Sequence, residues 1–175
     1  MSQTAQAHLG RVNVVSDDNQ LGQVSRFQDA DYTILSKPVL LSCLNVYGVL
    51  VKNSSAAAML PGLGYTFKSG FPGLEVGALS GANAICDGIC DPWIPAAGCP
   101  IGSTCILIIN GPTLVKAGVG DIAAAAVLQT LANGLFTSAT PGTNPIGHSG
   151  RAAEAAASGS FARALFHNPF ATLQC

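Results

Sequence analysis

Short apolar segments separated by turn-forming clusters recur from residue 32 onward, and this alternation constrains the fold more than any other feature of the sequence. The segments YTIL, PVLLSCLNVYGVLV, CILIING and PTLVKA are rich in aliphatic and β-branched residues. Turn clusters such as PGLG, KSGFPG, LSGAN and NGP lie between apolar segments of this kind. β-Branched residues favour strands, whereas Gly, Pro and Asn favour turns. The pattern therefore predicts a mostly β fold.

The chain of 175 residues suits one domain with a substantial core. Residues 1–30 are polar, contain SDDNQ and show no sustained helical periodicity, so we expect an extended N-terminal arm that orders on a neighbour. Residues 31–175 are expected to form the β-rich domain. A Cys/Pro/Gly-rich insertion is expected within it at about 81–105.

Two alanine-rich segments leave the choice between helix and strand open. In DIAAAAVLQTLAN, Asp121 suits an N-cap and Asn133-Gly134 suits a stop; the second segment is GRAAEAAASG, before Phe161. Alanine favours helices, but isolated alanine-rich helices of this length are marginal. We therefore expect at most short helices, decided by tertiary context.

Charged residues are scarce. They make up 10% of the chain, against roughly 25% in ordinary soluble domains. The net charge is -1, the pI is near 6.2 and the Lys and Arg residues are scattered singly, so we expect no direct contact with nucleic acid. No apolar run approaches the ~20 residues of a membrane span. A surface so poor in charge favours a component of an assembly, whose surface meets partners.

The N-terminal stretch MSQTAQAHLGRVNVV has no basic region followed by an apolar one, so we expect synthesis in a cytoplasm without Sec-type export. The pattern NSS at Asn53 fits a glycosylation acceptor. Without a secretion signal, a turn is the expected role of this motif.

Four of the six cysteines crowd into CDGICDPWIPAAGCPIGSTC, at Cys86, Cys90, Cys99 and Cys105. Four thiolates can form a zinc site, but the five residues between Cys99 and Cys105 do not match the usual tight knuckles. Two interpretations remain open. The cysteines form one or two disulfides in an oxidising particle, or they are small buried apolar residues. Cys43 is expected in the core, and Cys175 is expected to be free or intermolecular.

The stretch GVGDIAAAA follows an apolar run and has the G-x-G-x-x-A spacing of dinucleotide-binding loops. Such a site also needs an acidic residue about twenty positions on for the ribose. The next carboxylate here is Glu154, much too late. We therefore predict no cofactor. GVGD is predicted to be a turn in which Gly118 and Gly120 take positive φ.

The sequence signals for a catalytic site are also weak. Nucleophilic hydrolysis needs a His beside a Ser or Cys, and the chain has only His8, His148 and His167. Ser149 directly follows His148, and adjacent residues on a strand point to opposite faces. No paired carboxylates stand out, so we expect a protein that is not an enzyme. The residues expected at an interface are Trp93, Glu154 and His148.

The C-terminal part of the chain resembles the tailed-phage capsid cement, or head decoration, proteins. The resemblance covers roughly residues 105–168 and lies in the order of glycines, alanines and apolar residues, with Asn133-Gly134 and Ser158-Gly159 as hairpin turns. Ala123–Ala126 departs from the family pattern, which has a polar residue or glycine there. The matching positions are Gly111, Gly118, Ile122, Leu128, Gly134, Phe136, Ile146, Gly147, Glu154, Ala155, Ala156, Gly159 and Phe161.

This resemblance implies a small β-barrel or β-tulip-like domain in a structural virion protein. The expected role is to bind the major capsid protein on the capsid exterior as a homotrimer and to stabilise the lattice. The alternative is a secreted disulfide-rich adhesion or ligand-binding module, with the loop from Cys86 to Cys105 as its binding face.

Overall fold

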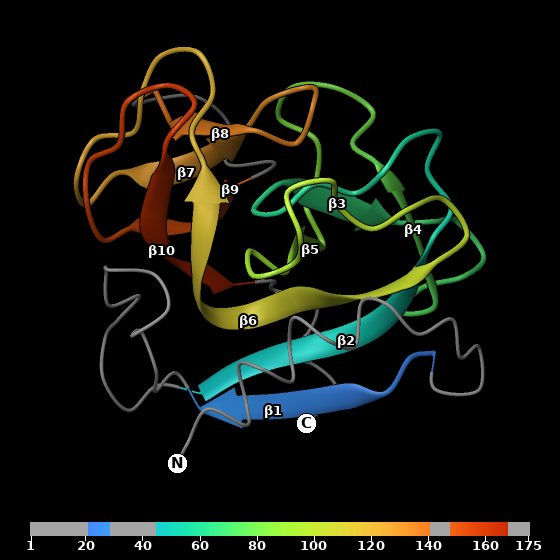
Figure 1. Cartoon of the computed structure of the whole chain (residues 1–175). Coiled ribbons are helices and arrows are strands. Elements are labelled where there is room, and N and C mark those ends of the chain that lie inside the picture. The colour runs from blue at the N-terminus through green and yellow to red at the C-terminus, as the bar shows by residue number, and fades with distance from the viewer. Residues whose placement is uncertain (1–20, 29–44, 141–147, 168–175) are drawn as a thin grey trace.

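The computed structural model describes residues 21–28, 45–140 and 148–167, and within these ranges the chain is built of strands and turns without a helix (Figure 1). The mostly β prediction is therefore confirmed. Several predicted features lie outside the described residues: residues 1–20 of the arm, YTIL, His8, Cys43, Ile146, Gly147 and Cys175. The strands of the described ranges are β1 Val24–Gln28, β2 Asn45–Asn53, β3 Gly64–Phe67, β4 Glu75–Ala78, β5 Gly88–Cys90, β6 Thr104–Lys116, β7 Val127–Thr130, β8 Phe136–Ser138, β9 His148–Ala152 and β10 Phe161–His167.

All the described strands join one sheet in the order β1-β2-β4-β3-β5-β6-β10-β9-β7-β8, with an additional pairing between β2 and β6. Every ladder is antiparallel except the short parallel one between β2 and β4. β1 lies within the segment predicted as an arm and pairs with β2 from Val24↔Val49 to Gln28↔Asn45. The end of that segment thus adds a strand to the sheet.

β6 connects the two halves of the molecule. Its first half pairs with β2 and β5, and its second half pairs with β10 (Figure 1). The sequence prediction of two strands separated by an NGP turn is wrong, because the 13-residue strand runs through this point. Gly111 has φ 106 there, a conformation open to glycine, and the strand bends without losing its ladder to β10.

The second half of β6, together with β10, β9, β7 and β8, curls into a partial ring. The ring returns to its start where Phe136 of β8 bridges Ala117, the residue after β6. The backbone N–H of Gly118 donates to the Phe136 carbonyl at 2.7 Å beside this bridge. This curling agrees with the predicted small barrel.

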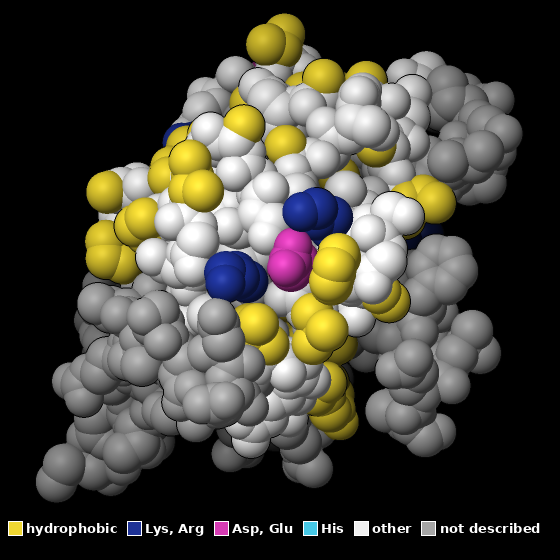
Figure 2. Space-filling view, turned by 90° about the vertical axis from the view of Figure 1, so that its right-hand side faces the viewer, with side chains coloured by type: hydrophobic (Ala, Val, Ile, Leu, Met, Phe, Trp, Pro, Cys, Tyr) yellow, Lys and Arg dark blue, Asp and Glu magenta, His cyan; other side chains and the backbone are white. Residues whose placement is uncertain are grey.

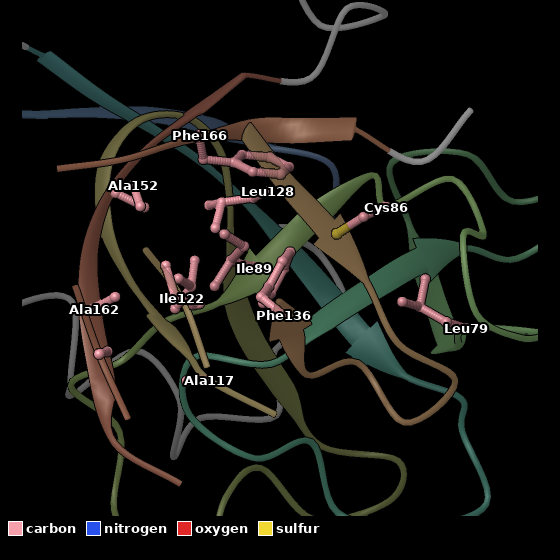
Figure 3. Close-up of a cluster of buried hydrophobic side chains, with 13 residues drawn as sticks. Leu79, Cys86, Ile89, Ala117, Ile122, Leu128, Phe136, Ala152, Ala162 and Phe166 are labelled. Carbon is pink, nitrogen blue, oxygen red and sulfur yellow. The ribbon is translucent and has the colours of Figure 1, made fainter. Parts of the chain in front are cut away.

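Most residues of the larger hydrophobic cluster, which we call the ring cluster, come from the ring, and Ile89 of β5 joins them (Figure 3). β10 shows the period of two that produces it: Ala162, Ala164 and Phe166 are buried, and the residues between them are more exposed. The cluster consists of Leu79, Cys86, Ile89, Val115, Ala117, Ile122, Leu128, Phe136, Ala152, Ala156, Ala162, Ala164 and Phe166.

A second cluster lies under β2, β3, β5 and the first half of β6, and includes Val49, Val51, Met59 and Leu107. The alternate residues of β2 and β6, Val46, Leu50, Ile106 and Ile108, form a third buried cluster on the opposite face. Burial on both faces explains why β2 and β6 read as nearly continuous apolar runs.

The alanine-rich segments adopt loops and strands. Ala123, Ala124 and Ala125 lie exposed in the loop before β7, and Ala125 has a positive φ of 60°. Ile122 and Ala156 exchange both backbone hydrogen bonds, at 2.8 and 2.9 Å. This pairing and the buried Ile122 side chain outweigh the helical preference of alanine, which gains little in so short a segment.

The segment at 81–105 contains β5 and the start of β6, joined mainly by turns. β5 pairs with both β3 and β6, and Ile89 and Cys90 are fully buried. Within the described residues, no helix is long and apolar enough to cross a membrane.

Candidate functional site

The loop that contains GVGD closes one end of the ring. Asp121 joins its own loop to the turn before β10 and to β8. Its carboxylate accepts a hydrogen bond from the Ser158 N–H at 2.7 Å, and its carbonyl accepts bonds from Thr137 Oγ1 at 3.1 Å and the Ser138 N–H at 3.3 Å. Asp121 itself has φ 53. GVGD is therefore a turn, as predicted, and it is not followed by the helix of a dinucleotide-binding unit.

The two glycines of this turn differ. Gly120 has φ 100, as predicted, but the prediction of a positive φ at Gly118 is wrong. Gly118 is required by packing, because a Cβ there would lie 2.4 Å from Leu131 Cδ1 and 2.9 Å from Leu135 Cβ. Both glycines predicted in hairpin turns have the positive φ that such turns use, with φ 80 at Gly134 and 82 at Gly159.

Cys86, Cys90, Cys99 and Cys105 are all buried and form no disulfide with one another. Cys86 packs in the ring cluster, whereas the other three belong to the cluster under β2. Burial raises the pKa of the Cys90 thiol, and hydrogen bonds among the thiols raise the pKa of Cys99 and Cys105. These groups are therefore thiols, not thiolates, near neutral pH. Among the described residues, no group of three or more His, Cys, Asp or Glu side chains is arranged to hold a metal ion.

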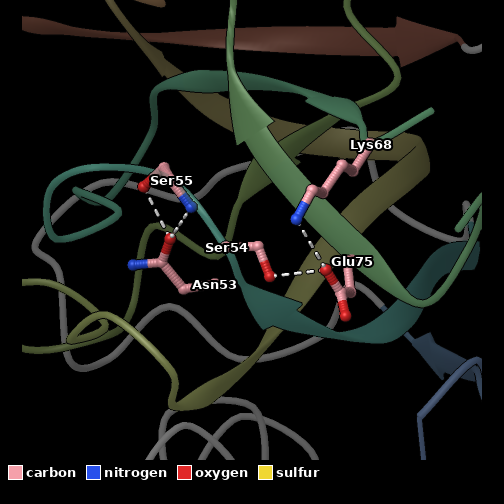
Figure 4. Close-up of polar contacts among 5 residues, drawn as sticks. All are labelled: Asn53, Ser54, Ser55, Lys68 and Glu75. Atoms are coloured by element: carbon pink, nitrogen blue, oxygen red, sulfur yellow. Dashed lines mark hydrogen bonds and ion pairs between the residues drawn. The ribbon is translucent and has the colours of Figure 1, made fainter.

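The buried side chain of Asn53 organises the turn that follows β2 (Figure 4). Its amide nitrogen donates to the carbonyls of Ala57 and Cys99, both at 2.9 Å, and its Oδ1 accepts from the Ser55 N–H at 3.0 Å. The side chain has no exposed surface. The prediction that NSS forms a turn is confirmed, because an Asn with both amide hydrogens engaged in the interior is closed to glycosylation.

A mixed polar and apolar surface lies on β4 and the turn that precedes it. Glu75 Oε2 accepts a hydrogen bond from Ser54 Oγ at 2.8 Å and pairs with Lys68 Nζ at 3.3 Å (Figure 4). These contacts lower the pKa of Glu75, chiefly the bond from Ser54. The Lys68 ammonium lies 5.8 Å from the centre of the Phe71 ring.

Hydrophobic side chains border this ion pair. Phe71 is 45% exposed and Leu74 is 39% exposed. Figure 2 shows the side of the molecule that carries β3 and β4, where an acidic side chain lies among basic and hydrophobic ones. We call Lys68, Phe71, Leu74 and Glu75 the β4 patch. The sequence offered KSGFPG only as a turn and gave no signal for this surface.

The three residues predicted at an interface lie in three different segments: the loop after β5, the start of β9 and the turn after β9. Glu154 pairs with Arg163 within the molecule, at 2.8 Å, and also accepts a bond from the Arg163 N–H at 3.2 Å, so it joins the turn after β9 to β10. Trp93 is half-buried, and its backbone N–H donates to the buried Asp91 carboxylate at 3.0 Å. The backbone of His148 begins β9 and pairs with Gln129.

No protein-family model matches the chain, and none of the curated proteins compared with it matches either. Among solved structures, the chain is similar to the N base of the head fiber gp8.5 of bacteriophage phi29, with a TM-score of 0.48 and 18% identity. The similarity covers 69% of this chain and 93% of that chain. At this identity and TM-score, the likeness carries no conclusion about the function of this chain.

Proposed function

We propose that the chain is a structural protein of a tailed-phage head, which binds the outer capsid lattice as a cement or decoration protein. The order of glycines and apolar residues between residues 105 and 168, where the sequence resembles that family, carries the proposal. These residues have defined roles in the ring: Ile122, Leu128 and Phe136 fill its core, and Gly134 and Gly159 form turns. The pattern is thus tied to the architecture of the ring.

The surface supports an assembly component. Only 10% of the chain is charged, and the described residues expose many large apolar side chains. Exposed apolar surface marks sites of association. The side chains concerned are Val24, Leu60, Phe71, Leu74, Ile85, Ile101, Val119, Phe161 and Leu165.

The mechanism we propose is mechanical. Three copies form a homotrimer at a local threefold position, and each contacts several major capsid proteins, so that weak contacts add up across a junction between subunits. Binding to the assembled lattice stabilises it against dissociation by mass action. The function involves no catalytic step, cofactor, nucleic acid or membrane, and the chain is made in the host cytoplasm before it joins the capsid exterior.

We propose the β4 patch as a contact with the major capsid protein. Its apolar side chains are available for burial, and Lys68 together with the nearby Lys52 outweighs Glu75 in charge. A partner surface that combines a carboxylate with an apolar side chain would complement this patch. Phe71 under the Lys68 ammonium is its central contact.

The test combines two measurements on the full chain. Light scattering should give three times the 17.7 kDa chain mass. The protein should then sediment with purified empty heads of tailed phages that lack their decoration protein, and should raise the temperature at which those heads dissociate. A stable monomer without affinity for any such head would reject the proposal.

A matched pair of variants tests the patch. Phe161 is also partly exposed beneath a lysine, with Lys116 Nζ 5.9 Å from its ring centre, but it lies on the ring. We expect Phe71→Ala to weaken head binding about tenfold and Phe161→Ala to change it little. The secreted adhesion alternative predicts instead that Trp93→Ala abolishes ligand binding while the oligomer persists.

A further inference from the structure

Three buried thiols and a thioether meet beneath β2. Cys105 Sγ lies 3.6 Å from Met59 Sδ, and Cys90 Sγ lies 3.8 Å from the Met59 carbonyl oxygen. Cys99 faces Met59 across an isolated bridge, with reciprocal backbone hydrogen bonds of 2.9 and 2.8 Å. All four residues are at most 1% exposed.

Cys105 is the centre of this group, because its thiol contacts the Met59 thioether and influences the pKa values of the thiols of both Cys90 and Cys99. Cys86 takes no part: its Sγ donates to the Gly88 carbonyl at 3.2 Å and its side chain packs in the ring cluster. A single disulfide can therefore form through Cys105, and the question is which neighbour joins it.

Strand geometry distinguishes the two partners. Cys90 lies opposite Leu107 in the β5–β6 ladder, so Cys90 and Cys105 are diagonal neighbours. Diagonal residues on antiparallel strands have Cα atoms about 7–8 Å apart, beyond the usual upper limit of about 6.8 Å for a disulfide. Cys99 lies outside the named strands, in the isolated bridge with Met59, and is not subject to this diagonal spacing. The span of the diagonal pair therefore disfavours Cys90 and leaves Cys99 as the expected partner of Cys105.

We propose that Cys99 and Cys105 are a disulfide-forming pair, shown here in its reduced state and joined by an external disulfide oxidant such as oxidised glutathione. The thiolate of one cysteine attacks the oxidant and releases one glutathione thiolate. The second cysteine then attacks the mixed disulfide and releases the other, so that two cysteine thiols are oxidised and one disulfide is reduced. Because both sulfurs are buried, the exchange takes place during folding or local opening of the loop.

The bond would fix the turn between residues 99 and 105. Gly102 donates to the Asn53 carbonyl at 2.8 Å, the Asn53 N–H donates to the Ser103 carbonyl at 2.8 Å, and the Asn53 side chain donates to the Cys99 carbonyl. The disulfide would therefore lock the support of the Asn53 turn. This inference is independent of the proposed capsid function.

The experiment uses the full chain with Cys43→Ser and Cys175→Ser as background. Reduced, denatured protein is refolded with and without a mixture of oxidised and reduced glutathione, free thiols are alkylated and linked peptides are identified by mass spectrometry. We expect a Cys99–Cys105 link in this background and also in Cys90→Ser. Cys86 should remain alkylatable after unfolding. The oxidised form should melt roughly 5–10 °C above the reduced form.

Three results would overturn the inference: all thiols alkylated after oxidative refolding, a link from Cys105 to Cys90, or a bond that involves Cys86. Cys99→Ser should lose both the link and the oxidative rise in melting temperature. If that variant does not fold, the comparison of oxidised and reduced protein in the parent background still decides the question.

Discussion

Gly150 of β9 lies opposite Phe166 of β10, and a Cβ on Gly150 would stand 2.1 Å from the Leu165 carbonyl oxygen. Gly150 also has φ 128, which side chains rarely permit. Gly111 faces Phe166 from the opposite side, on β6. Phe166, which like Phe136 is fully buried in the ring, thus lies between two glycines and fills the core that they leave open.

We predict that Gly150→Ala destabilises the fold by about 3 kcal/mol, because the methyl group meets a backbone atom that cannot rotate away and φ becomes strained. Gly77→Ala is the matched control, since Gly77 also lies in a strand but has no atom within 4 Å of its Cβ position. Urea unfolding measures both. Equal stability of the two variants would contradict the arrangement of β9 and β10.

A second prediction concerns the alanine loop. Ala125 has φ 60, which costs an L-residue about 1–2 kcal/mol and glycine almost nothing. Ala125→Gly should therefore raise the free energy of unfolding by about 0.5–1 kcal/mol after the entropy lost by glycine is subtracted. The measurement is chemical denaturation at neutral pH.

Ala124→Gly is the control for this prediction, because Ala124 is equally exposed but has no positive φ. It should lower stability by about 0.5–1 kcal/mol, opposite in sign to Ala125→Gly. If the segment were helical, both substitutions would be destabilising. Two destabilising results would therefore restore the helical interpretation.

Local pattern was enough to predict the strand content and several of the turns. The hairpin at Asn133-Gly134 and the turn at GVGD follow from residues that lie next to each other in the chain. The failures involve distant partners. NGP reads locally as a turn, but the ladder from Gly111 to Phe166 keeps β6 continuous. Gly118 is explained by Leu131 and Leu135, which no local pattern places beside it.

The site was less predictable than the fold for the same reason. The cysteine spacing left disulfides and burial both open, and only the sheet separates Cys86 from the other three thiols. The β4 patch depends on Ser54 and Glu75 meeting across the parallel β2–β4 ladder. Glu154 is paired within the chain because the turn after β9 returns to β10.

A third prediction tests the Asn53 turn. Asn53→Asp keeps the shape and the oxygen that accepts from Ser55, but it loses the donors to Ala57 and Cys99 and buries a carboxylate against two carbonyl oxygens. We expect a loss of about 3 kcal/mol, measured by urea unfolding at pH 7.

Ser54→Ala, one position along, serves as the comparison. Ser54 is only partly buried, and its hydroxyl bonds to a carboxylate at the surface, so its loss should change stability little. If Asn53→Asp unfolded at the same urea concentration as Ser54→Ala, the Asn53 side chain would not organise the turn.

The fourth prediction concerns the pH response of Glu75. Its pKa is lowered in the folded protein, chiefly by the hydrogen bond from Ser54 and further by Lys68. A lowered pKa means that the unfolded state binds more protons than the folded state. Ionised Glu75 therefore stabilises the folded protein above the unfolded pKa, and this stabilisation is lost as pH falls through the folded pKa. Ser54→Ala should shift the Glu75 pKa upward, toward that of a free glutamate.

Carboxyl NMR titration of the folded protein measures this shift directly. Ser69→Ala, on the same turn as Lys68 but with no hydrogen bond to Glu75 among its described contacts, should leave the titration unchanged. High salt should reduce the lowering of the Glu75 pKa by Lys68 more than the lowering by Ser54, because Lys68 is half exposed and its ion pair is screened. An unchanged Glu75 titration in Ser54→Ala would show that the ion pair alone sets this pKa.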